Sequence, residues 1–475
     1  MQFDTDFTMT IDGRKVEVSS SLSILNPATE QLVAQAPDAS AAHLDAAVTS
    51  ARRAFPAWSS TSLVERKRLL GKIAECLQAN AEGFKNLLTL EQGKPHADSF
   101  MEVMYSSMWF GLVAQLDIPI EVREDSADRR AEVHHVPLGV VGAIVPWNFP
   151  ILLAVMKIAP ALLAGNTVVL KPAPTTPLTA LKLGELLRDV LPPGVLNVIS
   201  GGDSLGPAMT AHGGIDKISF TGSTQTGRKV MQSAAATLKR VTLELGGNDP
   251  AIVMPDVDVG KAAPELFWAA FRNNSQFCLA TKRMFIHEDI YEPMKRALTE
   301  IAQSVKIGNG AEEGVQLGPI QNRLQFERVK KLIEEARSSG LTLIASDCPV
   351  GKGYFVPVTL VDNPPDDSRV VVEEAFGPVL PLLKFKTVDE VVERANASEY
   401  GLGASIWSAN VEQAYAIGQR LHCGTVWINE IHYQSPFVPF GGHKQSGIGA
   451  ENGVEGLLEY TNAQTIYIRK TSSIL

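Results

Sequence analysis

Cys278 lies at the end of an apolar run in FRNNSQFCLATKR (residues 271–283), among amides, a hydroxyl and two cations. A thiol in such a run can simply be packed, because free cysteine is among the most frequently buried residues. As a thiolate it is a strong nucleophile toward a carbonyl carbon. Its residue type alone favours a packed thiol over a nucleophile. The polar residues that the fold places beside it determine which role is correct.

Two further residues could take part in such chemistry. Glu244 stands near the end of the run VTLEL (241–245), which two glycines follow. Its carboxylate could be paired with a cation, which is the simpler expectation, or it could have a raised pKa and serve as a base. Asn148 stands in PWNFP, where prolines stiffen the backbone. Its amide could stabilise a developing oxyanion or satisfy a nearby loop carbonyl.

Two motifs could bind a nucleotide. FTGSTQTG (220–227) is a glycine-hydroxyl turn that opens a helix, and it suits either a phosphate or an ordinary N-cap at Ser223 or Thr224. Lys171 ends an apolar strand in KPAPTTP. It is either a solvated strand-end lysine or a hydrogen-bond donor to a ribose.

Strand-like runs that alternate with helix-length segments would position these residues. Five strands separated by four helices (151–165, 177–191, 205–212 and 224–236) predict a parallel, doubly wound sheet, whose ligands bind beyond the carboxyl ends of the strands. These strands are GVVGAIV (139–145), NTVVLK (166–171), LNVIS (196–200), DKISF (216–220) and VTLEL (241–245). A second α/β domain is predicted from MFIH (284–287), TLIAS (342–346), LPLLKF (380–385), GASIW (403–407) and GTVWIN (424–429), separated by helices such as 326–338 and 411–421.

Two segments do not fit a parallel sheet. IPIEV (118–122) and AEVHHV (131–136) flank DSADRR, which predicts a hairpin, and QTIYIRK (464–470) predicts a terminal strand. Isolated hairpins are marginal in water and bare strand edges invite pairing. We therefore expect both segments to pair, most simply with another subunit.

Composition bounds the class of protein. The 475 residues are 45% hydrophobic and 20% charged, which indicates a globular chain with two or three domains. A net charge of −9 with no Lys/Arg run of five gives no reason to expect nucleic acid. No clean apolar stretch reaches about 18 residues and the N-terminus is not a signal peptide, so we expect no membrane association. Four cysteines without CxxC predict free thiols in a reducing compartment, the cytoplasm, and no Cys/His cluster suggests a metal.

Taken together, the motifs resemble the aldehyde dehydrogenase superfamily over nearly the whole chain. The resemblance rests on ILNPATE (24–30), PWNFP (146–150), KPAPTTP (171–177), FTGSTQTG (220–227), ELGG (244–247), NNSQFC (273–278), EEAFGP (373–378) and PFGGHKQSGIG (439–449). The length and the glutamate of ELGG are similar to the non-acylating, water-using branch.

The resemblance implies an α/β fold with two doubly wound domains, a Rossmann-like cofactor domain and a catalytic thiol domain, plus a small β oligomerisation element. The implied NAD(P)-binding domain comprises residues 1–117 and 138–246, and the implied catalytic domain residues 247–446. The hairpin (118–137) and the terminal strand (460–475) would form the interfaces of a homodimer or homotetramer.

The resemblance also implies roles for individual residues. Cys278 matches the nucleophile, and the Asn148 amide and the Cys278 backbone N–H would hold the oxyanion. Glu244 matches the general base that activates water against the thioester. Lys157 and Glu451 match positions that support this base and its proton exit. The alternatives are that Lys157 caps a helix and that Glu451 is a surface acid.

By the same resemblance the cofactor is NAD or NADP. Lys171 would bind the adenosine-side ribose, and Gly222 and Ser223 the pyrophosphate. Glu374 would hold the nicotinamide ribose, Phe376 would pack near the ring, and Trp147 would lie in the cofactor groove. Pro174 departs from many NAD-preferring relatives, which carry a glutamate three residues after the lysine. The carboxylate of that glutamate would repel the 2′-phosphate of NADP. Because Pro174 lacks it, the choice between NAD and NADP stays open.

The substrate is expected to be a small aldehyde, with an aromatic or medium aliphatic one favoured. Arg272 offers an alternative, since similar arginines in semialdehyde-oxidising relatives grip a distal carboxylate. A surface ion pair is its simpler role. Met156 stands where those relatives offer a second arginine. The other candidate wall residues are Trp109, Phe149, Leu152, Leu153, Phe277, His432, Tyr433, Gln434 and Phe437.

Three other classes fit less well. A Cys-His hydrolase would need an imidazole in a partner motif beside Cys278, and none is recognisable. A CoA-acylating relative would not need Glu244. A non-catalytic binding scaffold is disfavoured because Cys278, Glu244 and Asn148 are all present.

Overall fold

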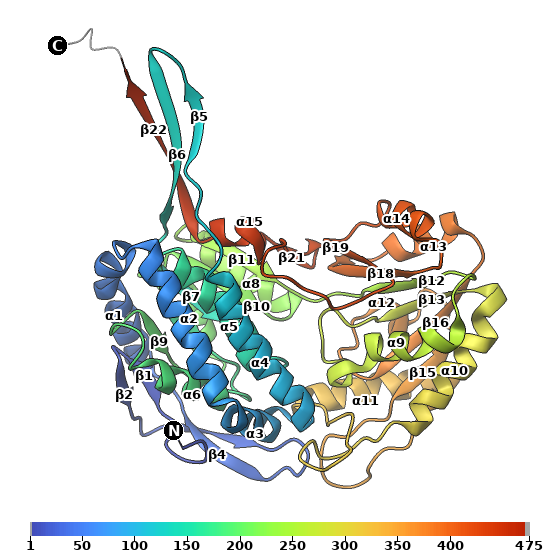
Figure 1. Cartoon of the computed structure of the whole chain (residues 1–475). Coiled ribbons are helices and arrows are strands. Elements are labelled where there is room, and N and C mark those ends of the chain that lie inside the picture. Colours follow the sequence, from blue (N-terminus) through green and yellow to red (C-terminus); the bar gives the residue numbers. More distant parts are fainter. Residues whose placement is uncertain (1, 471–475) are drawn as a thin grey trace.

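The computed structural model describes residues 2–470 and contains two large sheets side by side (Figure 1). The first sheet has the order β2-β1-β9-β8-β7-β10-β11-β21, and its central five strands are parallel. Its strands are β1 (Met9–Ile11), β2 (Arg14–Val16), β7 (Val140–Ile144), β8 (Thr167–Lys171), β9 (Leu196–Val198), β10 (Lys217–Thr221), β11 (Arg240–Glu244) and β21 (Gly447–Ile448).

All five strands and four helices predicted for this region are present in the predicted order, with small differences at their ends. Strand β8 is buried at every residue, as expected for a central parallel strand covered on both faces. The N-terminal strands β1 and β2 were not predicted; they extend the sheet as antiparallel edge strands. The covering helices are α1 (Ala41–Ser59), α2 (Leu63–Ala79), α3 (Ala81–Gln92), α4 (His96–Val113), α5 (Pro150–Leu163), α6 (Leu178–Leu187), α7 (Leu205–Ala211) and α8 (Thr224–Ala235).

The second sheet has the order β14-β15-β16-β13-β12-β18-β19 and is parallel except at β14. A separate apolar core lies on each of its faces. Its strands are β12 (Pro250–Val253), β13 (Arg283–His287), β14 (Leu343–Ala345), β15 (Thr359–Asp362), β16 (Val379–Phe385), β18 (Gly403–Trp407) and β19 (Thr425–Ile428). Its helices are α9 (Val259–Phe271), α10 (Tyr291–Ser304), α11 (Arg323–Ser338), α12 (Arg369–Val372), α13 (Val388–Asn396) and α14 (Val411–Gly418), with the 3₁₀ turns η1 (Arg272–Ser275) and η2 (Glu288–Ile290).

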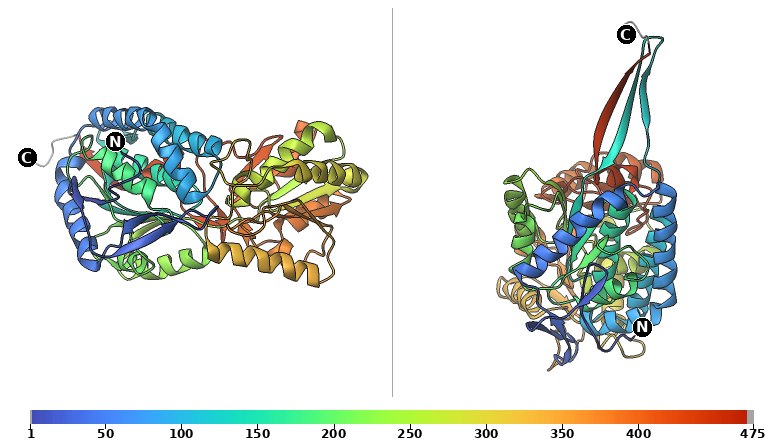
Figure 2. Two further views of the ribbon diagram at one scale, coloured as in Figure 1. Left: turned by 90° about the horizontal axis from the view of Figure 1, so that it is seen from below. Right: turned by 90° about the vertical axis from the view of Figure 1, so that its left-hand side faces the viewer.

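A three-stranded antiparallel ribbon projects from the body in both side views (Figures 1 and 2). It consists of β5 (Glu121–Asp125), β6 (Arg129–Pro137) and β22 (Thr461–Arg469). The predicted hairpin is present, but its first strand begins at Glu121 rather than Ile118, and β6 takes in the end of the predicted turn. The terminal strand pairs with β6 of its own chain and begins before the predicted Gln464. Residues 471–475 of that predicted element lie outside the described residues.

Two short pairs complete the fold, β3 (Ser21–Leu25) with β4 (Leu32–Pro37) and β17 (Tyr400–Gly401) with β20 (His443–Lys444). After the second sheet the chain returns to the first, where β21 pairs with β11 so that Gly447 lies opposite Glu244. A bridge between Phe440 and Glu451 and the short helix α15 (Gly453–Leu458) follow. This return brings Glu451 to the end of β11. Within residues 2–470, no helix is both long and apolar enough to cross a bilayer.

Candidate active site

The three predicted catalytic side chains come together in one pocket between the two sheets. Cys278, Glu244 and Asn148 all line it, from the turn after η1, the end of β11 and the loop before α5. Its remaining walls are mostly apolar and consist of Phe149, Leu152, Leu153, Met156, Thr221, Leu245, Phe277, Leu279, Gln434, Phe440 and Glu451.

The turn that presents the cysteine is strained and held by side-chain hydrogen bonds. Asn273, Asn274 and Ser275 have φ values of 51°, 57° and 58°, in the left-handed region that is costly for residues with a Cβ. The Ser275 hydroxyl donates to Ala270 O at 2.6 Å. The Asn273 amide donates to Asn148 O at 3.1 Å. The turn is therefore fastened to the helix before it and to the loop that carries Asn148.

Two donors are suitably placed for an oxyanion. The Asn148 side chain is buried, and its Nδ2 donates one hydrogen bond, to Gln276 O at 3.0 Å, which leaves its second N–H unused. The backbone N–H of Cys278 donates to none of residues 2–470. Both N–H groups are thus available to a carbonyl oxygen bound at Cys278.

A buried ion pair fixes the loop that carries Asn148. Lys94 Nζ lies 2.6 Å from Glu102 Oε2 and donates to Asn148 O at 2.9 Å, with both charged side chains almost fully buried. Glu102 Oε1 accepts from the backbone N–H groups of Ile151 and Leu152 at the start of α5, at 3.1 and 3.3 Å. The pair therefore caps α5 and holds the Asn148 carbonyl at once.

The thiol is protonated in this arrangement. Burial raises the pKa of Cys278 to about 12, and the positive charge of Lys282 opposes the shift. Lys282 Nζ donates to the Cys278 carbonyl at 2.5 Å and lies 3.5 Å from Glu374 Oε1. Attack by this cysteine therefore needs a base that removes its proton.

Glu244 has the properties of that base. It is buried, and neither carboxylate oxygen has a hydrogen-bond partner among the described residues. Burial raises its pKa well above that of an ordinary carboxyl group; the charge of Glu451 adds to the shift and that of Lys157 opposes it. Lys157 and Glu451 form a fully buried ion pair, Nζ to Oε1 at 2.5 Å. Lys157 therefore does not cap a helix end, and Glu451 is not a surface acid.

The loop predicted to meet the nicotinamide also lies beside this pocket. Glu374 Oε1 accepts from the backbone N–H of Gly247 at 3.1 Å, and a Cβ at Gly246 would meet Glu374 Oε2 at 2.3 Å. Phe376 packs edge-on against Trp147, with 5.4 Å between ring centroids. The two glycines of ELGG therefore admit the Glu374 carboxylate close to the base and the thiol.

The remaining predicted cofactor residues lie at or just beyond the carboxyl ends of β8 and β10. Lys171 is nearly buried; burial lowers its pKa to about 8, and among residues 2–470 its amine donates only to Pro172 O, at 3.2 Å. A buried amine with spare donors suits ribose hydroxyls. The Ser223 hydroxyl accepts a hydrogen bond from the Thr226 N–H, so Ser223 is the N-cap of α8. The first turn of α8, after Gly222, is partly exposed and suits a pyrophosphate. Pro174 offers no carboxylate.

The predicted substrate residues separate into two groups. Phe149, Leu152 and Phe277 line the pocket, and His432 packs against Phe277 with 4.6 Å between ring centroids and an angle of 45° between the ring planes. Burial lowers the pKa of His432 to about 3, so its ring is neutral.

Arg272, Phe437 and Trp109 do not line this pocket. Arg272 and Phe437 are exposed, whereas Trp109 is packed in the apolar core around the first sheet. The charge of Arg272 contributes to the lowered pKa of His432, and it opposes the raised pKa that burial gives Asp98, which places the arginine near both residues. Arg272 forms no ion pair with any of the described residues, so the predicted surface ion pair is absent from this part of the chain.

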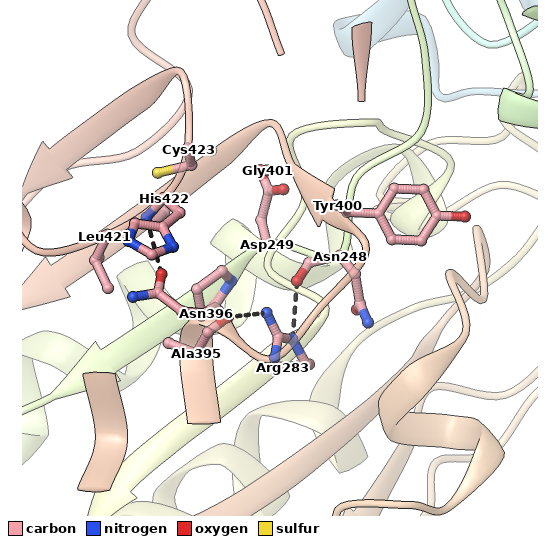
Figure 3. A pocket seen from close by; sticks show the side chains of 13 residues that line it. Asn248, Asp249, Arg283, Ala395, Asn396, Tyr400, Gly401, Leu421, His422 and Cys423 are labelled. Atoms are coloured by element: carbon pink, nitrogen blue, oxygen red, sulfur yellow. Dashed lines mark hydrogen bonds between the residues drawn. The ribbon is translucent and has the colours of Figure 1, made fainter. Parts of the chain in front are cut away.

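A second pocket lies at the amino end of β12 and shares no residue with the first (Figure 3). In it Arg283, at the start of β13, donates to Asn248 O and Ala395 O, both at 2.9 Å. These hydrogen bonds connect β13 with the segment before β12 and with α13. Burial raises the pKa of its Cys423 thiol to about 12. No predicted site residue lines this pocket.

Comparison with known proteins identifies the family of the chain. The family model described as "Aldehyde dehydrogenase family" matches residues 15–466. A probable aldehyde dehydrogenase from Pseudomonas sp. is 44% identical over 99% of this chain and 96% of its own, and a phenylacetaldehyde dehydrogenase from Pseudomonas fluorescens is 40% identical over 97% and 95%. An NAD+ complex of aldehyde dehydrogenase from Bacillus cereus superposes with a TM-score of 0.94 at 36% identity, covering 99% of this chain and 98% of that one.

The chain therefore belongs to the aldehyde dehydrogenase family. It is an oxidoreductase that acts on the aldehyde group, and it has the two-sheet α/β fold of the solved family members.

Several residues of the site were not predicted from the sequence. Lys94 and Glu102 could have been found, because Glu102 is the only charge between Asp98 and Asp117 and a single acid in an apolar helix indicates a buried partner. Asn273 and Lys282 stand within the motif around the cysteine. Nothing in their residue types indicated that they would bind the Asn148 and Cys278 carbonyls.

Replacing Lys94 by methionine should destabilise the protein and slow catalysis. The change leaves Glu102 buried without its cation, which costs about 3–5 kcal/mol, and it removes one of the two side-chain hydrogen bonds to the Asn148 carbonyl. Urea unfolding and kcat measure the two effects. Lys331→Met is the matched control, since its side chain is 74% exposed and 3.7 Å from Glu335, and its loss should cost less than about 1 kcal/mol. Equal midpoints for the two variants would contradict a stabilising role for the buried pair.

Proposed function

We propose that the protein oxidises an apolar aldehyde to the carboxylic acid, with NAD or NADP as hydride acceptor and water as second substrate. One observation carries this proposal: a cysteine with an unused backbone N–H shares an apolar pocket with a buried carboxylate that has no hydrogen-bond partner. The first group suits attack on a carbonyl and the second suits activation of water.

In the first half of the reaction, Glu244 takes the proton of the Cys278 thiol and the thiolate attacks the aldehyde carbon. The alkoxide that forms is held by the Asn148 amide and the Cys278 N–H, which the strained turn and the Lys94 contact keep in place. A nicotinamide, when bound, would supply the hydride acceptor, and loss of hydride from the adduct would leave a thioester on Cys278.

In the second half, Glu244 removes a proton from water, which attacks the thioester and releases the acid. The raised pKa of Glu244 makes its carboxylate a stronger base than an exposed glutamate. Within the Lys157–Glu451 pair, the charge of Glu451 raises the pKa of Glu244 and the charge of Lys157 lowers it. The pair would also lie on the path by which the proton leaves Glu244. CoA is not required, because Glu244 activates water directly.

The cofactor would lie along the carboxyl ends of β7, β8, β10 and β11. Lys171 would bind the adenosine ribose, Gly222 and Ser223 would hold the pyrophosphate at the first turn of α8, and Glu374 would bind the nicotinamide ribose. The absence of a carboxylate at Pro174 removes a penalty against a 2′-phosphate, so we propose either NAD or NADP.

The pocket supports an aromatic or medium aliphatic substrate. Its lining contains Phe149, Phe277 and Met156 and, apart from the catalytic groups, no charged side chain that could pair with a distal carboxylate. The phenylacetaldehyde dehydrogenase of similar sequence is consistent with this class. An acidic semialdehyde through Arg272 is the weaker alternative, since the arginine is exposed outside the lining.

We further propose that residues 1–117 and 138–246 form the cofactor domain, 247–446 the catalytic domain, and the ribbon a homo-oligomer interface. The free edge of β22 carries Ile466, Tyr467 and Ile468, which are 40%, 69% and 45% exposed. An exposed apolar edge strand favours pairing with a second copy. Four free cysteines support a reducing compartment such as the cytoplasm.

Replacing Cys278 by alanine should abolish oxidation, because no other thiol lines the pocket. Glu244→Gln should slow thioester formation, because the thiol loses its base, and the thioester should then release acid roughly 10²-fold more slowly than in the wild type. The measurement is quenched flow without CoA, with reduced cofactor and free acid quantified separately. Full activity of Cys278→Ala would reject the mechanism, and equal slowing of both products in Glu244→Gln would reject the role of Glu244 in thioester hydrolysis.

Acid release should accelerate as the pH rises, with a midpoint above the ordinary glutamate value of about 4.3. The raised pKa of Glu244 keeps the carboxyl protonated, and thus inactive as a base, until the pH exceeds that pKa. The check is the rate of thioester hydrolysis from about pH 5 to 9. A wild-type profile that is flat over this range would mean that Glu244 is ionised throughout.

A panel of aldehydes tests the substrate class. We expect kcat/KM for a phenyl-bearing aldehyde to exceed that for an acidic semialdehyde by at least about tenfold, since a buried carboxylate without a cation is costly. Arg272→Leu should leave this ratio unchanged within about twofold, as for an exposed charge. A selective loss of the acidic substrate in that variant would instead favour Arg272 as its anchor.

A further inference from the structure

A row of polar side chains runs along one face of β10 and β11, from the carboxyl ends of these strands at the active site toward their amino ends. In KISFT the alternate residues Lys217, Ser219 and Thr221 share one face, and in β11 Thr242 and Glu244 do the same. The strands pair in parallel with Ser219 opposite Thr242 and Thr221 opposite Glu244. All five side chains are buried. Such a row is unusual for a central parallel sheet, whose strands are normally apolar on both faces.

The row begins at the general base and continues away from the pocket. At its upper end lie Glu244 and the Lys157–Glu451 ion pair. In the middle, the buried Tyr460 hydroxyl donates to Ser219 Oγ at 3.1 Å. The charge of Glu451 contributes to a raised pKa of Tyr460, which places this phenol close to Glu451.

The row ends at a carboxylate that reaches solvent. Lys217 Nζ donates to Thr242 Oγ1 at 2.6 Å and lies 3.7 Å from Glu459 Oε2. The Thr242 hydroxyl in turn donates to Glu459 at 3.4 Å. The Lys217 side chain is fully buried, whereas 34% of the Glu459 side chain is exposed. Glu459 stands between α15 and β22, where the ribbon leaves the body (Figure 1).

The proposed reaction has to dispose of protons at this place. Aldehyde, water and oxidised cofactor give acid, reduced cofactor and one proton. Glu244 takes the thiol proton first and must lose it before it can accept a second one from water. The apolar lining of the pocket offers no other ionisable side chain than Glu451 to receive it.

We propose that Lys217, Thr242 and Glu459 form a proton exit that connects Glu244 and the Lys157–Glu451 pair with bulk solvent at the base of the ribbon. The inference rests on the proposed function. Lys217 and Glu459 act through Glu244 and touch no reacting atom, so they are positioning and relay residues.

The charges around Lys217 suit this role. Burial lowers its pKa to about 8, so its amine can both hold and release a proton near neutral pH. The charged groups that face it are Glu459 and Glu451, which raise this pKa, and Lys157 and Arg240, which lower it. Carboxylates and amines therefore lie along the row from the pocket to the surface, and the hydroxyls of Tyr460, Ser219 and Thr242 between them can both accept and donate.

Glu459→Gln tests the exit with little risk to folding, because the side chain is partly exposed. In a single turnover with enzyme in excess, the thioester should form at the wild-type rate and hydrolyse about 5- to 20-fold more slowly, since Glu244 stays protonated longer. Added imidazole should restore the rate by carrying the proton. Glu455→Gln is the matched control: the residue is exposed on α15, it makes no side-chain contact with the row, and the variant should behave as wild type.

The outcomes separate the two proposals. If the wild type forms no thioester with any aldehyde and either cofactor, the proposed function fails and the exit fails with it. If thioester hydrolysis in Glu459→Gln matches that in Glu455→Gln with and without imidazole, the exit is overturned while the function stands. Thr242→Val provides a second variant: slowed hydrolysis that imidazole restores supports the exit, and slowing that imidazole leaves unchanged indicates a packing role and overturns it.

Discussion

The burial of one carboxylate without a hydrogen bond constrains much of this structure. Keeping Glu244 in an apolar pocket is costly, and it is possible only because surrounding elements keep other donors away from it. The return of the chain through β21 places Gly447 opposite Glu244 and brings Glu451 beneath it. The Lys157–Glu451 pair satisfies its own charges and leaves Glu244 unpaired but influenced by both. A glutamate in this state can accept a proton from either a thiol or water.

A second constraint is the orientation of the oxyanion donors. The amide of Asn148 is useful only if its loop stays fixed while the substrate changes geometry. That loop is held from one side by Lys94 and from the other by Asn273, which bind the same carbonyl oxygen. The left-handed turn before Cys278 is the cost of this arrangement, and its side-chain hydrogen bonds offset the cost. Strain and buried charge therefore occur where the geometry matters for catalysis.

The sequence predicted the elements better than the contacts between distant segments. The alternation of apolar runs and helices was sufficient for β7 to β11, because central parallel strands have a strong local signature. Short edge strands such as β1 and β21 carry no such signature and depend on pairing partners. Cys278, Glu244 and Asn148 were identified from motifs, whereas the Lys94–Glu102 pair and the exposure of Arg272 follow from packing that no local pattern encodes. Phe437 likewise lies outside the pocket although its neighbourhood in the chain suggested otherwise.

The polar face of β10 and β11 connects these points. A fold that needed only stability would place apolar residues at Lys217, Ser219 and Thr242, because burying an amine costs more than its hydrogen bonds return. The opposite faces of the same strands carry Ile218, Phe220, Val241 and Leu243 and pack normally. The asymmetry begins at Glu244, the residue whose protonation state must change during each turnover, and it ends at the partly exposed Glu459. A sheet face that is polar only between a proton acceptor and solvent is best explained by the need to move protons between them.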